Sequence, residues 1–226
     1  EVVADFDFAT PSDRSRAIAS LLTPALVHGG LLEGRAPLEL GEADDSQSGK
    51  GYKVKVVCAV YNDKPQTATQ KKRGVGDIEE SMATALLSGS VFVSLDNVRG
   101  VLDMPGLESA LTEDTYDARA PYRQPAAVDM KRVVLMMTTN GAELTRDLAN
   151  RSSPVRILKR PEGYKFRVYP EGDVLSHVRA NQGKYLGAVF AVVKAWHAAG
   201  KPRTGEGRWP ADGAAIRGGA ENGTAM

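Results

Sequence analysis

The loop of residues 41–51, with the sequence GEADDSQSGKG, is the first part of the chain that could do chemistry. A short apolar run precedes it, and a segment with helically spaced apolar residues follows it. Such a loop can bind phosphate, because its backbone N–H groups and the helix N-terminus meet the anion and the lysine adds a positive charge. The sequence therefore predicts phosphate binding by Ser46, Gln47, Ser48, Gly49, Lys50 and Gly51.

This loop matches the nucleotide-binding pattern G-x-x-x-x-G-K-[ST] only in part. Asp44 occupies the position of the first glycine, and Gly51 replaces the hydroxyl residue that normally holds Mg²⁺. A Gly-Lys pair is also common by chance. A helix-capping loop with an exposed lysine is therefore the alternative interpretation.

A second candidate is Asp96, which ends a run of β-forming residues at 91–95. A carboxylate at the carboxyl end of a buried strand can hold the water shell of Mg²⁺ beside a nucleotide, so Asp96 is the predicted metal ligand. A turn-capping aspartate is the alternative. The glutamate that usually follows is Asn97 here, so either Glu80 or Glu79 acts as the base, or hydrolysis is slow.

Two further polar residues follow in the chain. Asn140 ends the apolar run 133–139, where its amide could orient a water molecule beside the γ-phosphate. Arg151 follows a short helical segment and could complete a phosphate site across a subunit boundary. The alternatives are a turn-forming Asn-Gly pair and a cation at a helix C-terminus.

The elements that must position these residues alternate along the chain. Strands are predicted at 37–41, 67–69, 90–96, 133–140 and 155–159, with helices between them, which indicates a parallel α/β sheet. Residues 116–119 and 126–130 are typical of a hairpin. The first helix is expected to kink or restart at Pro24, and a helix is expected over 143–149.

The composition excludes several classes of protein. The chain has 226 residues, 42% of them hydrophobic, and 29 basic against 28 acidic residues give a net charge of +1. No global basic field attracts nucleic acid, and a single cysteine, Cys58, excludes an intrachain disulfide. The longest apolar run falls far short of the ~20 residues that cross a bilayer. We therefore expect a soluble, cytoplasmic protein that makes no use of a membrane, and a first residue other than Met indicates a fragment of something longer.

Taken in order, the loop with lysine, the strand with aspartate, the strand with asparagine and the arginine resemble the ATPase core of AAA+ proteins. The likeness is greatest to the superfamily-three and minichromosome-maintenance-like helicases, or primase-helicases, of phages and mobile elements. It rests on residues 90–100 (SVFVSLDNVRG) and 137–156 (MTTNGAELTRDLANRSSPVR) and extends from Asp5 to Pro202.

This resemblance implies a role for each candidate. Lys50 would contact the nucleotide phosphates, Asp96 would support Mg²⁺, Asn140 would be the sensor and Arg151 the arginine finger. The hairpin at 116–130 would contact DNA. The fold implied is a three-layer P-loop NTPase sheet with a small helical lid. Its segments would be a lead-in (1–35), an ATPase core (36–169), the lid (170–202) and a loose tail (203–226).

The function implied is an ATP-hydrolysing motor that drives a replicative helicase and uses ATP and Mg²⁺. It would work as a homo-oligomeric ring on DNA. A nucleotide-binding assembly module with weak or no hydrolysis is the first alternative, favoured by Gly51 and Asn97. A small-molecule kinase is the second, supported only by the sequence Gly49-Lys50-Gly51.

Overall fold

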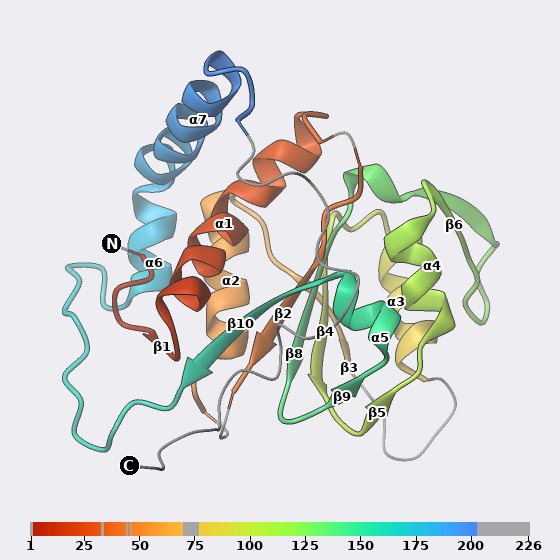
Figure 1. Cartoon of the computed structure of the whole chain (residues 1–226), viewed down its shortest axis with the longest axis horizontal. Helices are drawn as coiled ribbons and strands as arrows, with labels where there is room; N and C mark the ends of the chain where they lie inside the picture. Colours follow the sequence, from red (N-terminus) through yellow and green to blue (C-terminus); the bar gives the residue numbers. More distant parts are fainter. Residues whose placement is uncertain (1, 33, 44, 46, 70–76, 203–226) are drawn as a thin grey trace, which may run out of the picture.

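A six-stranded sheet forms the centre of the molecule in the computed structural model, which describes residues 2–32, 34–43, 45, 47–69 and 77–202 (Figure 1). Its strands follow the spatial order β1-β10-β2-β8-β4-β3. β1 is antiparallel to its neighbour, and the other five strands are parallel. Their bounds are β1 Asp7–Phe8, β10 Ser152–Leu158, β2 Leu38–Glu42, β8 Val134–Thr139, β4 Phe92–Val98 and β3 Gln66–Thr69. The predicted α/β fold with a mostly parallel sheet is confirmed.

The central strands β2, β8 and β4 are buried on both faces, whereas the edge strand β3 is mostly exposed. In β8, Val134 and Met136 pack in one apolar cluster, and Leu135 and Met137 pack in another. This alternation is the two-residue period of a strand. The sheet therefore needs helices on both sides.

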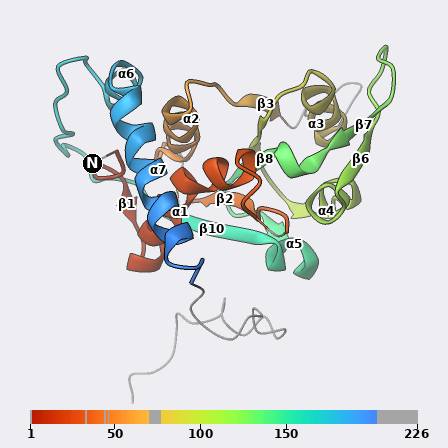
Figure 2. The same cartoon turned by 90° about the horizontal axis from the view of Figure 1, so that it is seen from above.

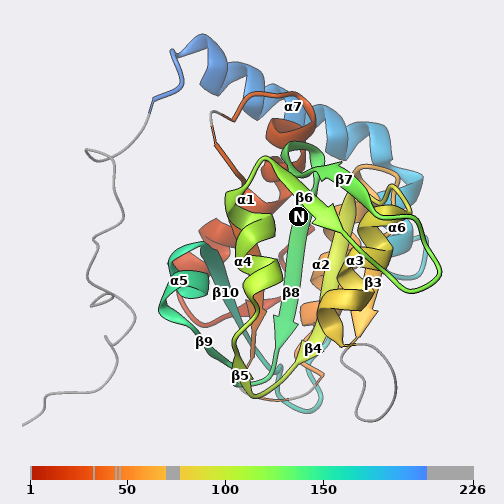
Figure 3. The same ribbon diagram turned by 90° about the vertical axis from the view of Figure 1, so that its right-hand side faces the viewer.

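Figures 2 and 3 show how these helices divide between the two faces. One face is covered by α1 (Pro11–His28) and α2 (Lys50–Val60), on which α6 (Val174–Ala180) and α7 (Gln182–Ala198) pack as a further layer. The other face carries α3 (Ile78–Leu87), α4 (Pro105–Thr112) and α5 (Arg146–Asn150).

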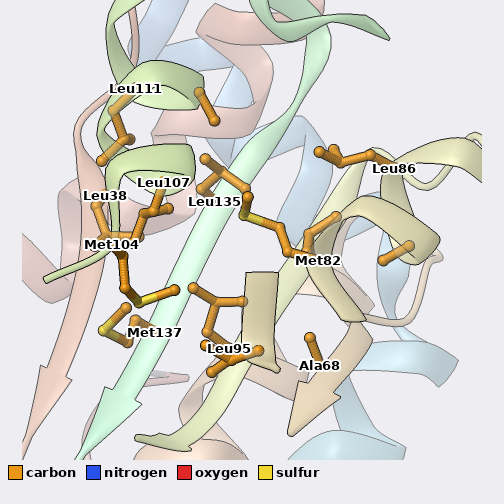
Figure 4. Packing of buried hydrophobic residues seen from close by; sticks show 14 of the residues in the cluster. Leu38, Ala68, Met82, Leu86, Leu95, Met104, Leu107, Leu111, Leu135 and Met137 are labelled. Carbon is orange, nitrogen blue, oxygen red and sulfur yellow. The ribbon is translucent and has the colours of Figure 1, made fainter. Parts of the chain in front are cut away.

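The core between the sheet and the second group of helices is formed by leucine and methionine side chains (Figure 4). Met82 of α3 and Leu107 of α4 are fully buried there against Leu95 and Met137 of the sheet. Burying a side chain of this size contributes roughly 1.5–3 kcal/mol. This core fixes β4 and β8, the two strands that carry Asp96 and lead to Asn140.

Two small sheets lie beside this core. β6 (Thr115–Ala118) and β7 (Ala126–Asp129) form the predicted hairpin, which a 3₁₀ turn (Met130–Arg132) links to β8. β5 (Val101–Leu102) pairs with β9 (Glu143–Leu144), where a helix was predicted. The helix starts later because Thr145 caps it: its hydroxyl accepts from the N–H of Leu148 at 3.2 Å.

α1 continues through Pro24 as one helix, so the predicted restart does not occur. Tyr61, the C-cap of α2, bonds to α1 beside this proline. The Tyr61 hydroxyl accepts from the N–H of Ala25 at 3.1 Å and donates to the carbonyl of Leu21 at 2.6 Å. The hydroxyl thus bonds to an N–H and a carbonyl that would otherwise bond to each other within α1. Burial raises the pKa of Tyr61 to about 12, so the hydroxyl stays a donor.

The loose tail expected at 203–226 lies outside the described residues. Within the described part of the chain, no helix combines the length and apolarity that a membrane span requires.

A buried ion pair attaches α2 to the sheet. Lys53 of α2 donates to the carboxylate of Glu39 in β2, and the two residues are only 2% and 7% exposed. Glu39 shares a face of β2 with Gly41, where a Cβ would lie 3.6 Å from the Cβ of Lys50. The backbone of α2 therefore approaches the strand closely, and the ion pair holds it there.

We expect Lys53→Met to lower the free energy of unfolding by about 3–5 kcal/mol, because it leaves the Glu39 carboxylate buried without a partner. The double variant Lys53→Met/Glu39→Leu should recover most of that loss. Urea denaturation followed by circular dichroism measures both. A single variant as stable as the unchanged chain would show that the pair does not hold α2 on β2.

Candidate functional site

The phosphate-loop residues connect the end of β2 to the start of α2, at the carboxyl edge of the parallel strands. Gly49 caps α2 with a φ of 94°, a left-handed conformation that favours glycine. A Cβ there would also lie only 3.3 Å from the ring of Phe6. Gln47, Ser48, Gly49, Lys50 and Gly51 are described in the structure. Ser46 lies outside the described residues.

Lys50 extends from the first turn of α2 to the end of β8. Its Nζ donates to the Oδ1 of Asn140 at 2.6 Å and to the Oγ of Ser48 at 3.4 Å. The residue is 8% exposed, which is unusual for a lysine. The structure therefore brings together Lys50 and Asn140, although 90 positions separate them in the chain.

Asp96 is placed next to this pair by a hydroxyl that the sequence analysis missed. The Thr138 hydroxyl donates to the Oδ1 of Asp96 at 2.6 Å and accepts from the N–H of Asn97 at 2.8 Å. Thr138 is 2% exposed. The sequence feature that could have identified Thr138 is its place at the carboxyl end of an otherwise apolar strand, two positions before Asn140.

Asn97 closes the network. Its backbone has a φ of 55°, and it lies within β4 where the pairing with β8 shifts register between Leu95 and Val98. Its Oδ1 accepts from the Nδ2 of Asn140 at 3.0 Å. One hydrogen-bonded series thus runs from Lys50 through Asn140, Asn97 and Thr138 to Asp96.

These residues line a cleft of about 380 Å³. Two cations, Lys50 and Arg99, and one anion, Asp96, give its lining a formal charge of +1. The sequence analysis also missed Arg99, because it lies three residues after Asp96, where the predicted strand ends. An open cleft with net positive charge and exposed loop N–H groups can bind an anion such as a phosphate.

A larger cavity of about 540 Å³ adjoins the cleft and shares Gln47, Ser48 and Gly49 with it. Its other walls come from the N-terminal segment, from α2 and from the connection between β10 and α6. The aromatic residues that line it are Phe6, Tyr52, Tyr164, Phe166 and Tyr169. A flat apolar group attached to a phosphate would fit this combination of walls.

The donor set for a metal ion consists of a single carboxylate. Gly51 supplies no hydroxyl, and a Cβ at that position would lie 3.9 Å from the Oδ1 of Asp96. Among the described residues, no group of three or more His, Cys, Asp or Glu could hold a metal. A site with a single carboxylate could hold Mg²⁺, which binds through one or two carboxylates together with substrate phosphates and waters.

Neither candidate base lines the cleft. Glu79, in the first turn of α3, accepts from the N–H of Gly106 at 2.8 Å and so joins α3 to α4. Glu80 stands beside it in the same turn and does not contribute to the lining of the cleft. Among the residues that the structure describes, Asp96 is the one acid in that lining.

Arg151 lies at the opposite edge of the sheet. It is the C-cap of α5, and its carbonyl accepts from the N–H of Leu38, the first residue of β2, at 2.8 Å. The phosphate loop follows the other end of that strand. The structure therefore does not bring Arg151 to the cleft of its own chain.

No known protein family and no curated protein matches the sequence. Among solved structures, the JCV helicase bound to a thiazolopyridine acetamide is similar to 83% of this chain at 12% identity and a TM-score of 0.42. The apo C-terminal region of NrS-1 is similar to 82% of it at 10% identity and a TM-score of 0.48. The chain spans 55% and 46% of the lengths of these two chains, about half of each.

Proposed function

We propose that this chain binds ATP with Mg²⁺ at the carboxyl edge of its sheet and hydrolyses it as the motor domain of a replicative helicase or primase-helicase. The hydrogen-bonded series from Lys50 to Asp96 is the observation that carries the proposal. It joins a phosphate-loop lysine, a strand-end amide and a strand-end carboxylate. A purely structural loop does not need this combination.

The two adjoining hollows fit the two halves of a nucleotide. The phosphates would lie in the cleft, against the loop N–H groups and Lys50, whose three N–H donors allow it to keep Asn140 while it binds an oxygen. The base would lie in the larger cavity, where aromatic side chains offer stacking partners. Gln47, Ser48 and Gly49 belong to both walls and would hold the phosphates between them.

Asp96 would hold Mg²⁺, which neutralises charge on the phosphates when it is bound. Thr138 keeps that carboxylate in place through its hydroxyl. The amides of Asn97 and Asn140 would orient the attacking water, a role that needs a donor and an acceptor rather than a base.

The DNA contact would come from the hairpin β6–β7. Its connecting loop carries exposed Arg119, Tyr122 and Arg123 and no acidic residue. Arginine neutralises phosphate and tyrosine stacks on a base. A ring of identical subunits would bring Arg151 to a neighbouring cleft.

An assembly module that binds ATP and hydrolyses it slowly is the second candidate. It is favoured by Asn97 and by the absence of any acid other than Asp96 from the cleft lining, within the residues that the structure describes. Steady-state ATP turnover with and without single-stranded DNA separates the two candidates. Turnover that DNA stimulates supports the motor, and tight binding without turnover supports the module.

Lys50→Ala should weaken ATP binding at least about 10-fold, because the phosphates lose a charge-assisted hydrogen bond in a partly buried site. Titration with a fluorescent ATP analogue measures the affinity. Lys55→Ala, which removes an exposed lysine from the same helix, is the matched control and should bind normally. Equal affinities of the two variants would remove the loop from the site.

Asp96→Asn should leave Mg²⁺-free nucleotide binding intact and lower Mg²⁺-dependent turnover by roughly 100-fold. The asparagine oxygen can still accept from Thr138, so the local fold is kept. Phosphate release at increasing Mg²⁺ measures the effect. As a reverse change, Gly51→Ser places a hydroxyl beside Asp96 and should lower the Mg²⁺ concentration needed for turnover. Unaltered Mg²⁺ dependence in both variants would contradict the assignment of Asp96.

Mixing Lys50→Ala with Arg151→Ala should restore turnover, although each variant alone is inactive. Mixed rings contain interfaces that pair an intact Lys50 with an intact Arg151, and a finger contributes roughly 10³- to 10⁵-fold to turnover. Phosphate release after subunit exchange is the measurement. Verified co-assembly without recovery, or full activity of Arg151→Ala alone, would exclude a finger acting between subunits.

A further inference from the structure

The Tyr52 hydroxyl joins α2 to the start of α6. Tyr52 lies in the first turn of α2, two residues after Lys50. Its hydroxyl accepts from the N–H of Leu175 at 3.2 Å and donates to the Oδ1 of Asp173 at 3.1 Å. Asp173 is the N-cap of α6, where the same oxygen accepts from the N–H of Ser176 at 2.8 Å. One hydroxyl therefore links the turn that carries Lys50 to the cap of another helix.

Apolar contacts between α2 and α6 lie farther along α2. Val178 of α6 is fully buried in the cluster that contains Val56 and Val60 of α2. At the end of α2, the Nε2 of Gln182 donates to the carbonyl of Val60 at 3.2 Å. The far end of α2 is thus held by packing and by the bond from Gln182, while the end near the phosphate loop is held by the Tyr52 hydroxyl.

The connection from β10 to α6 forms one wall of the large cavity. Gly163 and Gly172, with φ values of 84° and 101°, lie in it. Between β10 and Gly163, the guanidinium of Arg160 donates to the carbonyls of Asp5 and Phe6 and stacks over the Tyr164 ring at 4.3 Å. Just beyond Gly172, Asp173 and Leu175 are attached to α2 through their bonds to the Tyr52 hydroxyl.

The protonation states of the two partners match this bond. Burial raises the pKa of Tyr52, so its hydroxyl remains a donor. The N–H of Ser176 lowers the pKa of Asp173, so its carboxylate remains an acceptor. The bond is therefore a donor–carboxylate pair at neutral pH.

We infer that Tyr52 is a positioning residue that couples occupation of the large cavity to the placement of α6. The cavity is lined by Gly49 and Tyr52 on the α2 side and by Gly172, Asp173 and Val174 on the α6 side. A ligand that contacts both sides binds more tightly when the two sides are held together. Only such a difference in ligand affinity can shift the placement of α6 relative to α2. The inference rests on the proposed nucleotide site and adds the residue that links it to α6.

Tyr52→Phe tests this coupling, because it keeps the ring against the cavity and removes only the hydroxyl. We expect the affinity for ATP to fall roughly 2- to 12-fold, as for the loss of one hydrogen bond. The affinity for tripolyphosphate, which reaches only the phosphate cleft, should not change. Hydrogen exchange of residues 173–180 should be faster in the variant, and ATP should slow it less than in the unchanged chain.

Tyr61→Phe is the matched control, since it removes from the far end of α2 a hydroxyl that also makes two hydrogen bonds. It should lower the melting temperature and leave the ratio of ATP to tripolyphosphate affinity unchanged. Equal loss of both affinities in Tyr52→Phe, or unchanged exchange of residues 173–180, would overturn the coupling. Failure of the proposed function differs: the unchanged chain would bind neither ATP nor tripolyphosphate, while Tyr52→Phe would still alter the exchange of α6.

Discussion

The attachment of α2 to β2 is the constraint on which the rest of the site depends. The buried pair of Lys53 and Glu39, together with the missing side chain at Gly41, lets the helix lie close to the strand. Only from that position does Lys50 reach across the strand end to Asn140. A buried pair costs desolvation and adds little net stability. The pair instead fixes the position of α2 on β2, because a hydrogen-bonded contact resists the sliding that an apolar contact allows.

The order of the strands turns this one placement into a site. β8 lies between β2 and β4, so the end that carries Asn140 separates the phosphate loop from the end that carries Asp96. Asn140 therefore bonds to Lys50 on one side and Asn97 on the other. An amide suits this position, because it accepts from a cation with its oxygen and donates with its nitrogen. An aspartate there would bond Lys50 and repel the lone pair of Asn97.

Much of the fold could be predicted from sequence, because apolar runs and caps are local signals. The five parallel strands of the sheet follow from such patterns, whereas the two-residue strand β1 was not predicted. What failed depends on contacts between distant residues. Beside Pro24, the Tyr61 hydroxyl bonds to two backbone groups of α1, and nothing near Pro24 in the sequence reveals this. Thr138 and Arg99 were missed for the same reason: their roles arise only once β8 is inserted between its neighbours.

The position of Asn140 between Lys50 and Asn97 also bears on residue 97, which is an asparagine where a glutamate usually follows the aspartate. A carboxylate there would compete with Asn140 for Lys50 and add a second negative charge beside Asp96 in the cleft. With asparagine at position 97, the charge of Lys50 stays available to an incoming anion. The site then favours anion binding, and it gives up the base that a glutamate would supply. Under the proposed function, such a site would hold a nucleotide before hydrolysing it. A group that accelerates hydrolysis would then come from outside the cleft, and Arg151, whose carbonyl bonds to the first residue of β2, would act on the cleft of another subunit.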